Sequence, residues 1–144
     1  MKNFMDDQDF LLSTKTGEEL FHNFAEGMPI VDYHCHISPQ EIFENKSFKS
    51  ITEVWLGGDH YKWRLMRANG VDERFITGDA PAREKFQKWA ETLGRCVGNP
   101  VFEWSHLELK RYFGYEGVLN GKTAQEVWDL ANAKLAEASF TCRN

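Results

Sequence analysis

The stretch that decides the fold reads Pro29-Ile30-Val31-Asp32-Tyr33-His34-Cys35-His36-Ile37-Ser38-Pro39. It is a short apolar run that predicts a β-strand, and two histidines stand one residue apart near its end. Side chains alternate between the two faces of a strand, so Asp32, His34 and His36 share one face. Two imidazoles on one face can lean toward a common metal ion and supply half of its ligands. The alternative is a pair of hydrogen-bonded packing histidines, and the spacing alone does not separate the two interpretations.

A helix start follows the histidines directly. Ser38 fits the N-cap position, Pro39 fits the first helical position, and Glu41 can complete a capping box. A strand followed by a helix is the repeating unit of a (β/α)8 barrel, in which active sites lie at the carboxyl ends of the strands. The predicted metal ligands therefore stand where such a barrel builds its chemistry.

The chain is too short for a whole barrel, because it has 144 residues and a complete (β/α)8 barrel takes about 250. The rest of the pattern is helical and shows neither an internal repeat nor a low-complexity run. Further capping boxes are expected at Thr16–Glu19, Ser50–Glu53 and Thr123–Glu126. Helices are predicted over residues 17–26, 39–44, 51–56, 60–69, 81–93, 101–113 and 124–138, and the tail after them has no evident partner.

The composition is that of a folded protein with an acidic surface. Hydrophobic residues make up 42% and aromatic residues 14%, which is enough to build a core. There are 17 Lys and Arg against 22 Asp and Glu, so the net charge is −5. Surfaces that bind nucleic acid or anionic membranes use clustered basic residues, so neither partner is expected. A small acidic substrate stays compatible, because it needs only a few local cations.

The cysteines indicate a reducing compartment. Cys35, Cys96 and Cys142 are odd in number and irregularly spaced, which predicts three free thiols rather than a disulfide framework. No run approaches about 20 apolar residues, and acidic residues interrupt the N-terminus, so neither a membrane span nor a signal peptide is expected. The predicted location is the cytoplasm.

A second candidate site lies at the helix predicted from residue 60. Asp59 fits its N-cap, which places His60 and Tyr61 in the first turn. Unsatisfied backbone N–H groups and the positive end of the helix dipole favour an anion there. Arg64 and Arg67 share a face of this helix and could form a cationic patch for a carboxylate. The alternative is an exposed first turn with solvated arginines.

The helix predicted over residues 101–113 carries apolar side chains around much of its circumference, which predicts burial within a bundle. It also contains His106. We expect this residue to be a hydrogen-bonded structural histidine rather than a metal ligand.

Four motifs occur in the order in which they occur in uronate isomerases, and the chain resembles that family, a divergent branch of the amidohydrolase superfamily. The motifs are Met28–Glu41, Gly58–Arg64, Gly98–Pro100 and Trp104–Leu109. The resemblance runs from about Asp9 to Asn144. It implies an α/β fold: the first strand of a (β/α)8 metal-dependent-hydrolase-like barrel within residues 1–45, and a mostly helical inserted subdomain over residues 46–144. The segment itself is then mainly α.

The resemblance also implies an activity for the full-length parent. Uronate isomerases interconvert aldose and ketose hexuronates, D-glucuronate with D-fructuronate and D-galacturonate with D-tagaturonate. His34 and His36 would hold a divalent metal ion, with Zn²⁺ as the first choice, and Tyr61 with His60 beside it would face the hexuronate. The family's other ligands and its carboxylate-binding arginines would follow Asn144, so the segment alone is expected to be inactive. Assembly of the parent into a homo-oligomer is compatible with the sequence.

Two other functions stay open beside the isomerase. A metal-dependent hydrolase of the same superfamily would share His34 and His36 but has no need of the run from Asp59 to Trp63. A non-catalytic helical fragment or binding module would not depend on the two histidines at all. Hexuronate, amide and lactone substrates separate the first alternative from the isomerase, and replacing both histidines separates the second.

Overall fold

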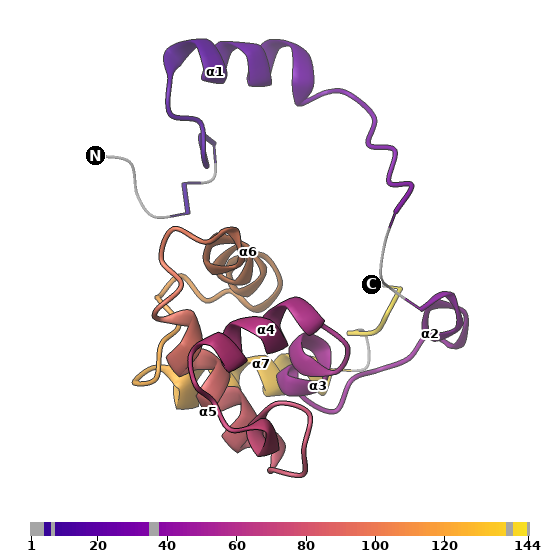
Figure 1. Ribbon diagram of the computed structural model, residues 1–144. Coiled ribbons are helices and arrows are strands. Elements are labelled where there is room, and N and C mark those ends of the chain that lie inside the picture. Colours follow the sequence, from indigo (N-terminus) through magenta and orange to yellow (C-terminus); the bar gives the residue numbers. More distant parts are fainter. Residues whose placement is uncertain (1–4, 7, 35–37, 138–139, 144) are drawn as a thin grey trace. The chain divides into compact units, whose positions relative to one another are not determined.

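The computed structural model describes residues 5–6, 8–34, 38–137 and 140–143 (Figure 1). The chain divides into two compact units, Met1–Ser38 and Pro39–Asn144. All regular structure within the described residues is helical. The expectation of a mainly helical segment is therefore confirmed.

In the described part of the first unit, α1 (Lys15–Leu20) continues into the π-helical turn η1 (Phe21–Ala25). Thr14 is its N-cap, and the Thr14 hydroxyl accepts a hydrogen bond from the Gly17 amide at 3.0 Å. The predicted capping box at Thr16 is therefore wrong by two residues. Thr14 has the extended backbone that an N-cap needs, whereas Thr16 already lies within the helix.

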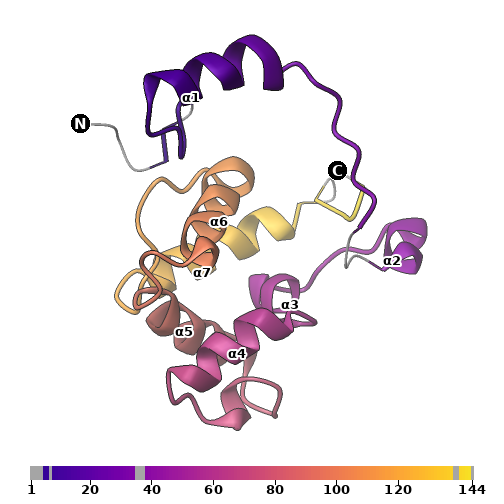
Figure 2. The same ribbon diagram turned by 45° about the horizontal axis from the view of Figure 1, so that its top comes forward.

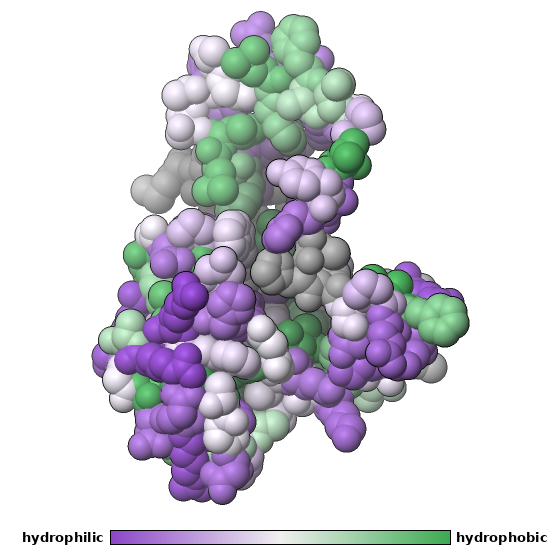
Figure 3. All heavy atoms as spheres, turned by 45° about the vertical axis from the view of Figure 1, so that its right-hand side comes forward, coloured by the Kyte–Doolittle hydropathy of each residue, from purple (hydrophilic) through white to green (hydrophobic). Residues whose placement is uncertain are grey.

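Apolar side chains gather on the surface of this helix (Figure 3). Leu20 and Phe24 belong to the stripe that was expected to pack, yet their side chains are more than half exposed. The apolar stripe is thus present on the helix, but no described residue of the first unit buries Leu20 or Phe24.

Residues 29–34 do not form the predicted strand. Their backbone has no regular structure, and Ile30 and Tyr33 are 94% and 95% exposed. The prediction of a first barrel strand is therefore wrong for this part of the structure, while Cys35, His36 and Ile37 lie outside the described residues. A strand needs a neighbour to bond its backbone N–H and C=O groups, and no described segment pairs with residues 29–34.

The second unit is a cluster of helices centred on α5, which contacts α3, α4 and α7 (Figures 1 and 2). A further helix, α6, continues into the π-helical turn η3, which packs on α7. The elements are α2 (Pro39–Glu44), α3 (Ile51–Leu56), α4 (His60–Ala68), the 3₁₀ turn η2 (Glu73–Phe75), α5 (Ala82–Leu93), α6 (Pro100–Glu108), η3 (Leu109–Phe113) and α7 (Ala124–Leu135).

The core of the second unit is built on one face of α5. Its buried stripe has the predicted helical spacing and consists of Phe86, Trp89, Ala90 and Leu93. The Phe86 ring lies between Trp55 of α3 at 6.1 Å and Trp128 of α7 at 5.6 Å, measured between ring centroids. Burial of these large rings supplies much of the hydrophobic stabilisation of the unit.

The helix caps confirm most of the predicted boundaries. Ser50 caps α3 and Asn99 caps α6 through their side-chain oxygens. Thr123 precedes α7 as predicted, but its side chain makes no cap bond. Its hydroxyl instead accepts from the Asn120 amide at 3.0 Å and donates to the Val118 carbonyl at 2.8 Å. The capping box at Thr123 is therefore wrong, because the hydroxyl is used to fold the preceding loop.

The last described residues lie along α2, so the prediction that the tail lacks a partner is wrong. The Cys142 amide donates to the Lys46 carbonyl at 3.0 Å, and Arg143 Nε donates to the Ile42 carbonyl at 2.8 Å. Nothing in the local sequence signals such backbone contacts, because they join segments about 100 residues apart. The predicted domain division after residue 45 concerns the longer protein and stays a prediction; here α2 belongs to the second unit.

The described ranges bear on two predictions, the absence of a membrane span and the free state of the cysteines. None of the helices in those ranges is long and apolar enough to cross a membrane. Cys96 and Cys142 are free thiols, as predicted, and burial raises the pKa of the Cys96 thiol. The third cysteine, Cys35, lies outside the described residues.

Candidate functional site

The candidate catalytic residues His60 and Tyr61 open α4, as the sequence predicts. Asp59 is the N-cap, and its Oδ1 accepts hydrogen bonds from the amides of Tyr61 at 3.0 Å and Lys62 at 3.1 Å. These two bonds fix the backbone of the first turn. The side chains of His60 and Tyr61 therefore leave the helix from a well-defined position.

The approach to this turn depends on a glycine and a tryptophan. A Cβ at Gly57 would lie 2.4 Å from the Glu53 carbonyl oxygen, so a larger residue would push α3 and the chain after it apart. Trp63 Nε1 donates to the Leu56 carbonyl at 2.8 Å, which binds α4 to the end of α3. The first turn of α4 is thus attached to the end of α3 through Trp63.

The Asp59 carboxylate already occupies the anion position at the start of α4. Lys62 Nζ donates to its Oδ2 at 2.6 Å, and the Lys62 side chain is only 13% exposed. Burial raises the pKa of the Asp59 carboxyl, but the bonds from the Lys62 ammonium and the two backbone amides outweigh it and leave the pKa below its usual value. The backbone donors expected to attract an external anion are therefore bonded within the chain.

The His60 and Tyr61 rings stack on each other. Their centroids are 4.6 Å apart and their planes differ by 28°. The Tyr61 side chain is exposed, at 57%, and the guanidinium carbon of Arg64 lies 5.4 Å from the centre of its ring. The structure thus brings the two predicted catalytic residues together and adds a cation beside the tyrosine.

The predicted patch of two arginines does not form. Arg67 Nε and Nη2 bond both oxygens of Glu73, at 2.8 and 2.5 Å. These bonds, with a further one from the Thr77 hydroxyl, lower the pKa of Glu73 to about 2. Arg67 is therefore held by a fork-to-fork ion pair with Glu73, and only Arg64 is left beside the Tyr61 ring.

The predicted metal ligands belong to the first unit. The His34 amide donates to Asp32 Oδ1 at 3.2 Å, and His36 lies outside the described residues. In the described ranges, no group of three or more His, Cys, Asp or Glu side chains is placed to hold a metal ion. Imidazole suits zinc, but catalytic zinc takes three protein ligands. The residue types of His34 and His36 therefore suit two of the three protein ligands of a zinc ion, and a third ligand has to come from elsewhere.

His106 is the structural histidine that the sequence predicts. It is almost fully buried, its Nδ1 lies 2.6 Å from the Phe102 carbonyl oxygen, and its Nε2 accepts from the Leu119 amide at 2.9 Å. The proton must therefore reside on Nδ1, which donates to the carbonyl. Burial lowers the pKa of the His106 imidazole, against a smaller opposing effect of the Phe102 bond.

Sequence reasoning missed Glu108. Trp55 Nε1 donates to its Oε2 at 2.6 Å, and burial raises the pKa of the Glu108 carboxyl although the charge of Lys62 and the Trp55 bond lower it. The group lies close enough to Asp59 and Lys62 for their charges to act on it. The sequence offers no signal that separates Glu108 from Glu103, the other acidic residue of α6.

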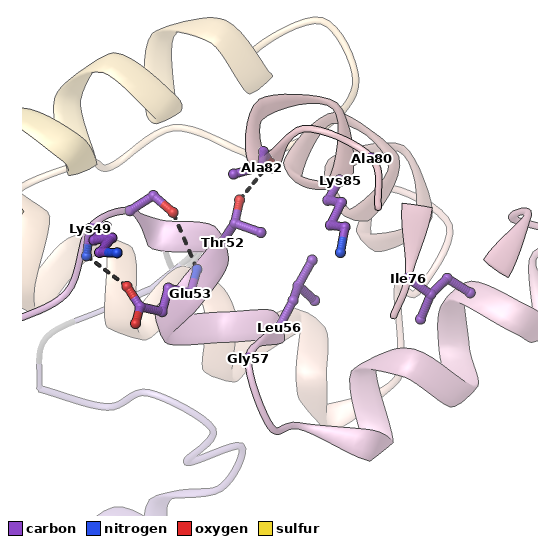
Figure 4. A pocket seen from close by; sticks show the side chains of 10 residues that line it. Lys49, Thr52, Glu53, Leu56, Gly57, Ile76, Ala80, Ala82 and Lys85 are labelled. Carbon is purple, nitrogen blue, oxygen red and sulfur yellow. Dashed lines mark hydrogen bonds between the residues drawn. The ribbon is translucent and has the colours of Figure 1, made fainter. Parts of the chain in front are cut away.

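A pocket of about 420 Å³ lies beside α3 in the second unit (Figure 4). Leu56 and Ile76 line it together with Lys49 and Lys85. Lys85 Nζ already donates to the Gly78 carbonyl at 2.6 Å. Neither His60 nor Tyr61 lines this pocket, so it is separate from the first turn of α4.

Comparison with known proteins places the whole chain in one family. The family model described as glucuronate isomerase matches residues 1–144. The uronate isomerase of Lachnospira eligens is 68% identical over 144 residues, which is 100% of this chain and 31% of the relative. The uronate isomerase of Endomicrobium trichonymphae is 61% identical over the same share of each chain. The chain therefore spans about a third of the length of these relatives.

Two solved structures agree with this match. The crystal structure of uronate isomerase from Thermotoga maritima has a TM-score of 0.82 and 42% identity, over 89% of this chain and 28% of that chain. The glucuronate isomerase from Caulobacter crescentus has a TM-score of 0.75 and 26% identity, over 82% of this chain and 26% of that chain. Since the family model covers every residue, the chain belongs to the glucuronate isomerase family.

Proposed function

We propose that the longer protein carrying this segment isomerises hexuronates between their aldose and ketose forms, D-glucuronate to D-fructuronate or D-galacturonate to D-tagaturonate. The observation that carries the proposal is the family match over all 144 residues, together with relatives named uronate isomerase at 61% and 68% identity. The hydrolase alternative receives no comparable support, because these relatives are named as isomerases.

Residues 29–37 are proposed to form the first strand of a (β/α)8 barrel of the amidohydrolase type in the longer protein. The exposure of Ile30 and Tyr33 supports this proposal, because extended apolar residues gain stability when neighbouring strands cover them. The helices of the second unit would then be an insertion after that strand. The similarity to 28% of the Thermotoga maritima chain leaves room for the other strands.

The chemistry of an aldose–ketose isomerisation defines what the residues must do. A proton moves between adjacent carbons, and negative charge develops on the sugar oxygens of an enediolate. Tyr61 is exposed, and its hydroxyl can donate a hydrogen bond to one of these oxygens. His60 stacks on the Tyr61 ring and places a second polar group at the same point of α4.

His34 and His36 are proposed to hold a divalent metal ion, Zn²⁺ as the first choice, with further ligands supplied by the rest of the protein. When bound, such an ion polarises a substrate oxygen. Metal content tests this part without any activity measurement. Replacing both histidines with alanine is expected to lower the bound zinc per chain, whereas the matched variant His22→Ala is expected to retain it.

Two further properties stay predictions about the longer protein. A cytoplasmic location is supported by the free thiols Cys96 and Cys142, since disulfides are rare in reducing compartments. A homo-oligomer is compatible with the apolar surface of α1, where Leu20 and Phe24 are exposed. Sedimentation of the longer protein measures the second property directly.

A chimera tests the proposed activity. Residues 1–144 replace the matching segment of the Lachnospira eligens uronate isomerase, and the product is assayed on both hexuronates and on amide and lactone substrates. We expect hexuronate isomerisation by the chimera and none by the 144-residue chain alone.

Tyr61→Phe is expected to lower kcat by roughly 100-fold, the effect of removing one preorganised donor. Tyr112→Phe, at another exposed tyrosine, is the matched control. Activity on amides or lactones alone would contradict the proposal.

A further inference from the structure

The proposed isomerisation assigns no role to the Arg64 cation beside Tyr61. Arg64 lies three residues after Tyr61 on α4, a spacing that puts the two side chains on one face of the helix. Its guanidinium carbon lies 5.4 Å from the centre of the Tyr61 ring, within the range of about 6 Å in which a cation is attracted to an aromatic face. The His60 ring stacks on the same tyrosine at 4.6 Å.

The other long basic side chains of α4 are committed to carboxylates. Lys62 bonds the cap residue Asp59 at 2.6 Å, and Arg67 forms its two bonds with Glu73. Among the residues that the structure describes, no acidic side chain forms an ion pair with Arg64. The structure instead places the Arg64 guanidinium against the Tyr61 ring.

We infer that Arg64 is a positioning residue, whose guanidinium holds the Tyr61 ring so that the hydroxyl keeps one direction toward the substrate. This inference rests on the proposed isomerase function. The backbone of the first turn is fixed by Asp59, but a half-exposed ring can still rotate about its side-chain bonds. His60 and Arg64 limit that rotation through ring contacts. Orientation matters because a misplacement of about 1 Å at a reacting group can cost up to 100-fold in rate.

A positioning role and a carboxylate-binding role for Arg64 predict different kinetics. If Arg64 orients Tyr61, its loss lowers kcat and leaves KM unchanged, because the group acts on the transition state. If Arg64 instead binds the substrate carboxylate in both states, its loss raises KM at unchanged kcat.

The kinetic test uses the chimera with three variants. Arg64→Met keeps the length of the side chain without its charge, and we expect kcat to fall roughly two- to fivefold, the range for an exposed cation–π contact. Arg64→Lys restores a cation and is expected to recover most of the loss. Arg67 lies on the same helix as Arg64. Arg67→Gln removes its ion pair with Glu73 and is expected to keep the parent kcat. A raised KM with unchanged kcat in Arg64→Met would overturn the inference.

A second readout needs no activity. The 144-residue chain has four tyrosines, so the ring signals of Tyr61 can be assigned in NMR spectra by single replacements. We expect Arg64→Met to move the Tyr61 ring signals and Arg67→Gln to leave them in place, with equal melting temperatures. Unmoved Tyr61 signals would overturn the inference whatever the chimera does. An inactive chimera with moved signals would contradict the isomerase proposal but support the contact.

Discussion

Loss of the His106 side chain is expected to lower the free energy of unfolding of the second unit. Its imidazole joins α6 to the loop before α7, because it bonds the Phe102 carbonyl on one side and the Leu119 amide on the other. Leu119 is fully buried, so its amide depends on the imidazole for an acceptor. His106→Ala therefore leaves a buried N–H group without an acceptor.

The magnitude follows from two contributions. An unsatisfied buried N–H group costs about 1–3 kcal/mol. The side chain is 1% exposed and its ring lies 4.4 Å from that of Phe102, so its removal also leaves a cavity. Together we expect a loss of about 3 kcal/mol in the free energy of unfolding. His106→Gln offers a side-chain oxygen that can accept from the Leu119 amide, and we expect it to recover part of the loss.

Urea unfolding followed by tryptophan fluorescence measures this effect in the second unit alone. All five tryptophans of the chain lie after residue 50, so their emission reports the unit that contains His106. The reasoning is refuted if His106→Ala unfolds within about 0.5 kcal/mol of the parent, the effect of an ordinary surface substitution. It is also refuted if His106→Gln is no more stable than His106→Ala.

The same residue predicts a pH dependence. Burial lowers the pKa of His106 below its ordinary value of 6.5, so the unfolded chain binds the proton more readily than the folded one. The stabilising contribution is therefore complete above about pH 6.5 and is lost as the pH falls from there toward the folded pKa. We expect the urea midpoint of the parent to decrease over this window and that of His106→Gln to change less.

Three further predictions concern other contacts. Asn132→Ala is expected to cost about 1–3 kcal/mol in urea unfolding, because Asn132 Oδ1 accepts from the buried Ile51 amide at 2.9 Å; Asn132→Asp, which keeps an acceptor, should cost less. Asp59→Ala is expected to cost about 0.5–2 kcal/mol through loss of the α4 cap, with Asp59→Ser as the capped control. His22 bridges two carboxylates at 3.0 Å, and its pKa is raised mainly by these bonds, so its contribution is complete below pH 6.5 and is lost as the pH rises. The protection of the α1 amides, measured relative to the base-catalysed intrinsic exchange rate, should therefore fall toward alkaline pH, and less so in His22→Gln.

The helical pattern was largely predictable because helix caps and stripes are local. Asp59 and Asn99 can bond amides two or three residues ahead, and such contacts need no distant partner. The stripe from Phe86 to Leu93 likewise reveals its buried face through spacing alone. Thr123 shows the limit of this reasoning: its hydroxyl had a competing partner in the loop before α7, which a four-residue pattern does not contain.

The sequence predicted where most helices begin and the family resemblance that the comparisons confirm. The pairing of charges became visible only in the fold: Arg67 pairs with Glu73, Lys62 pairs with Asp59, and the Arg64 guanidinium lies against the Tyr61 ring. The predicted strand over residues 29–34 does not form in the structure, because its formation also depends on distant contacts. A helix bonds its own backbone, whereas a strand is completed by a neighbour that may lie far away along the chain, so its formation depends on contacts that no local pattern contains.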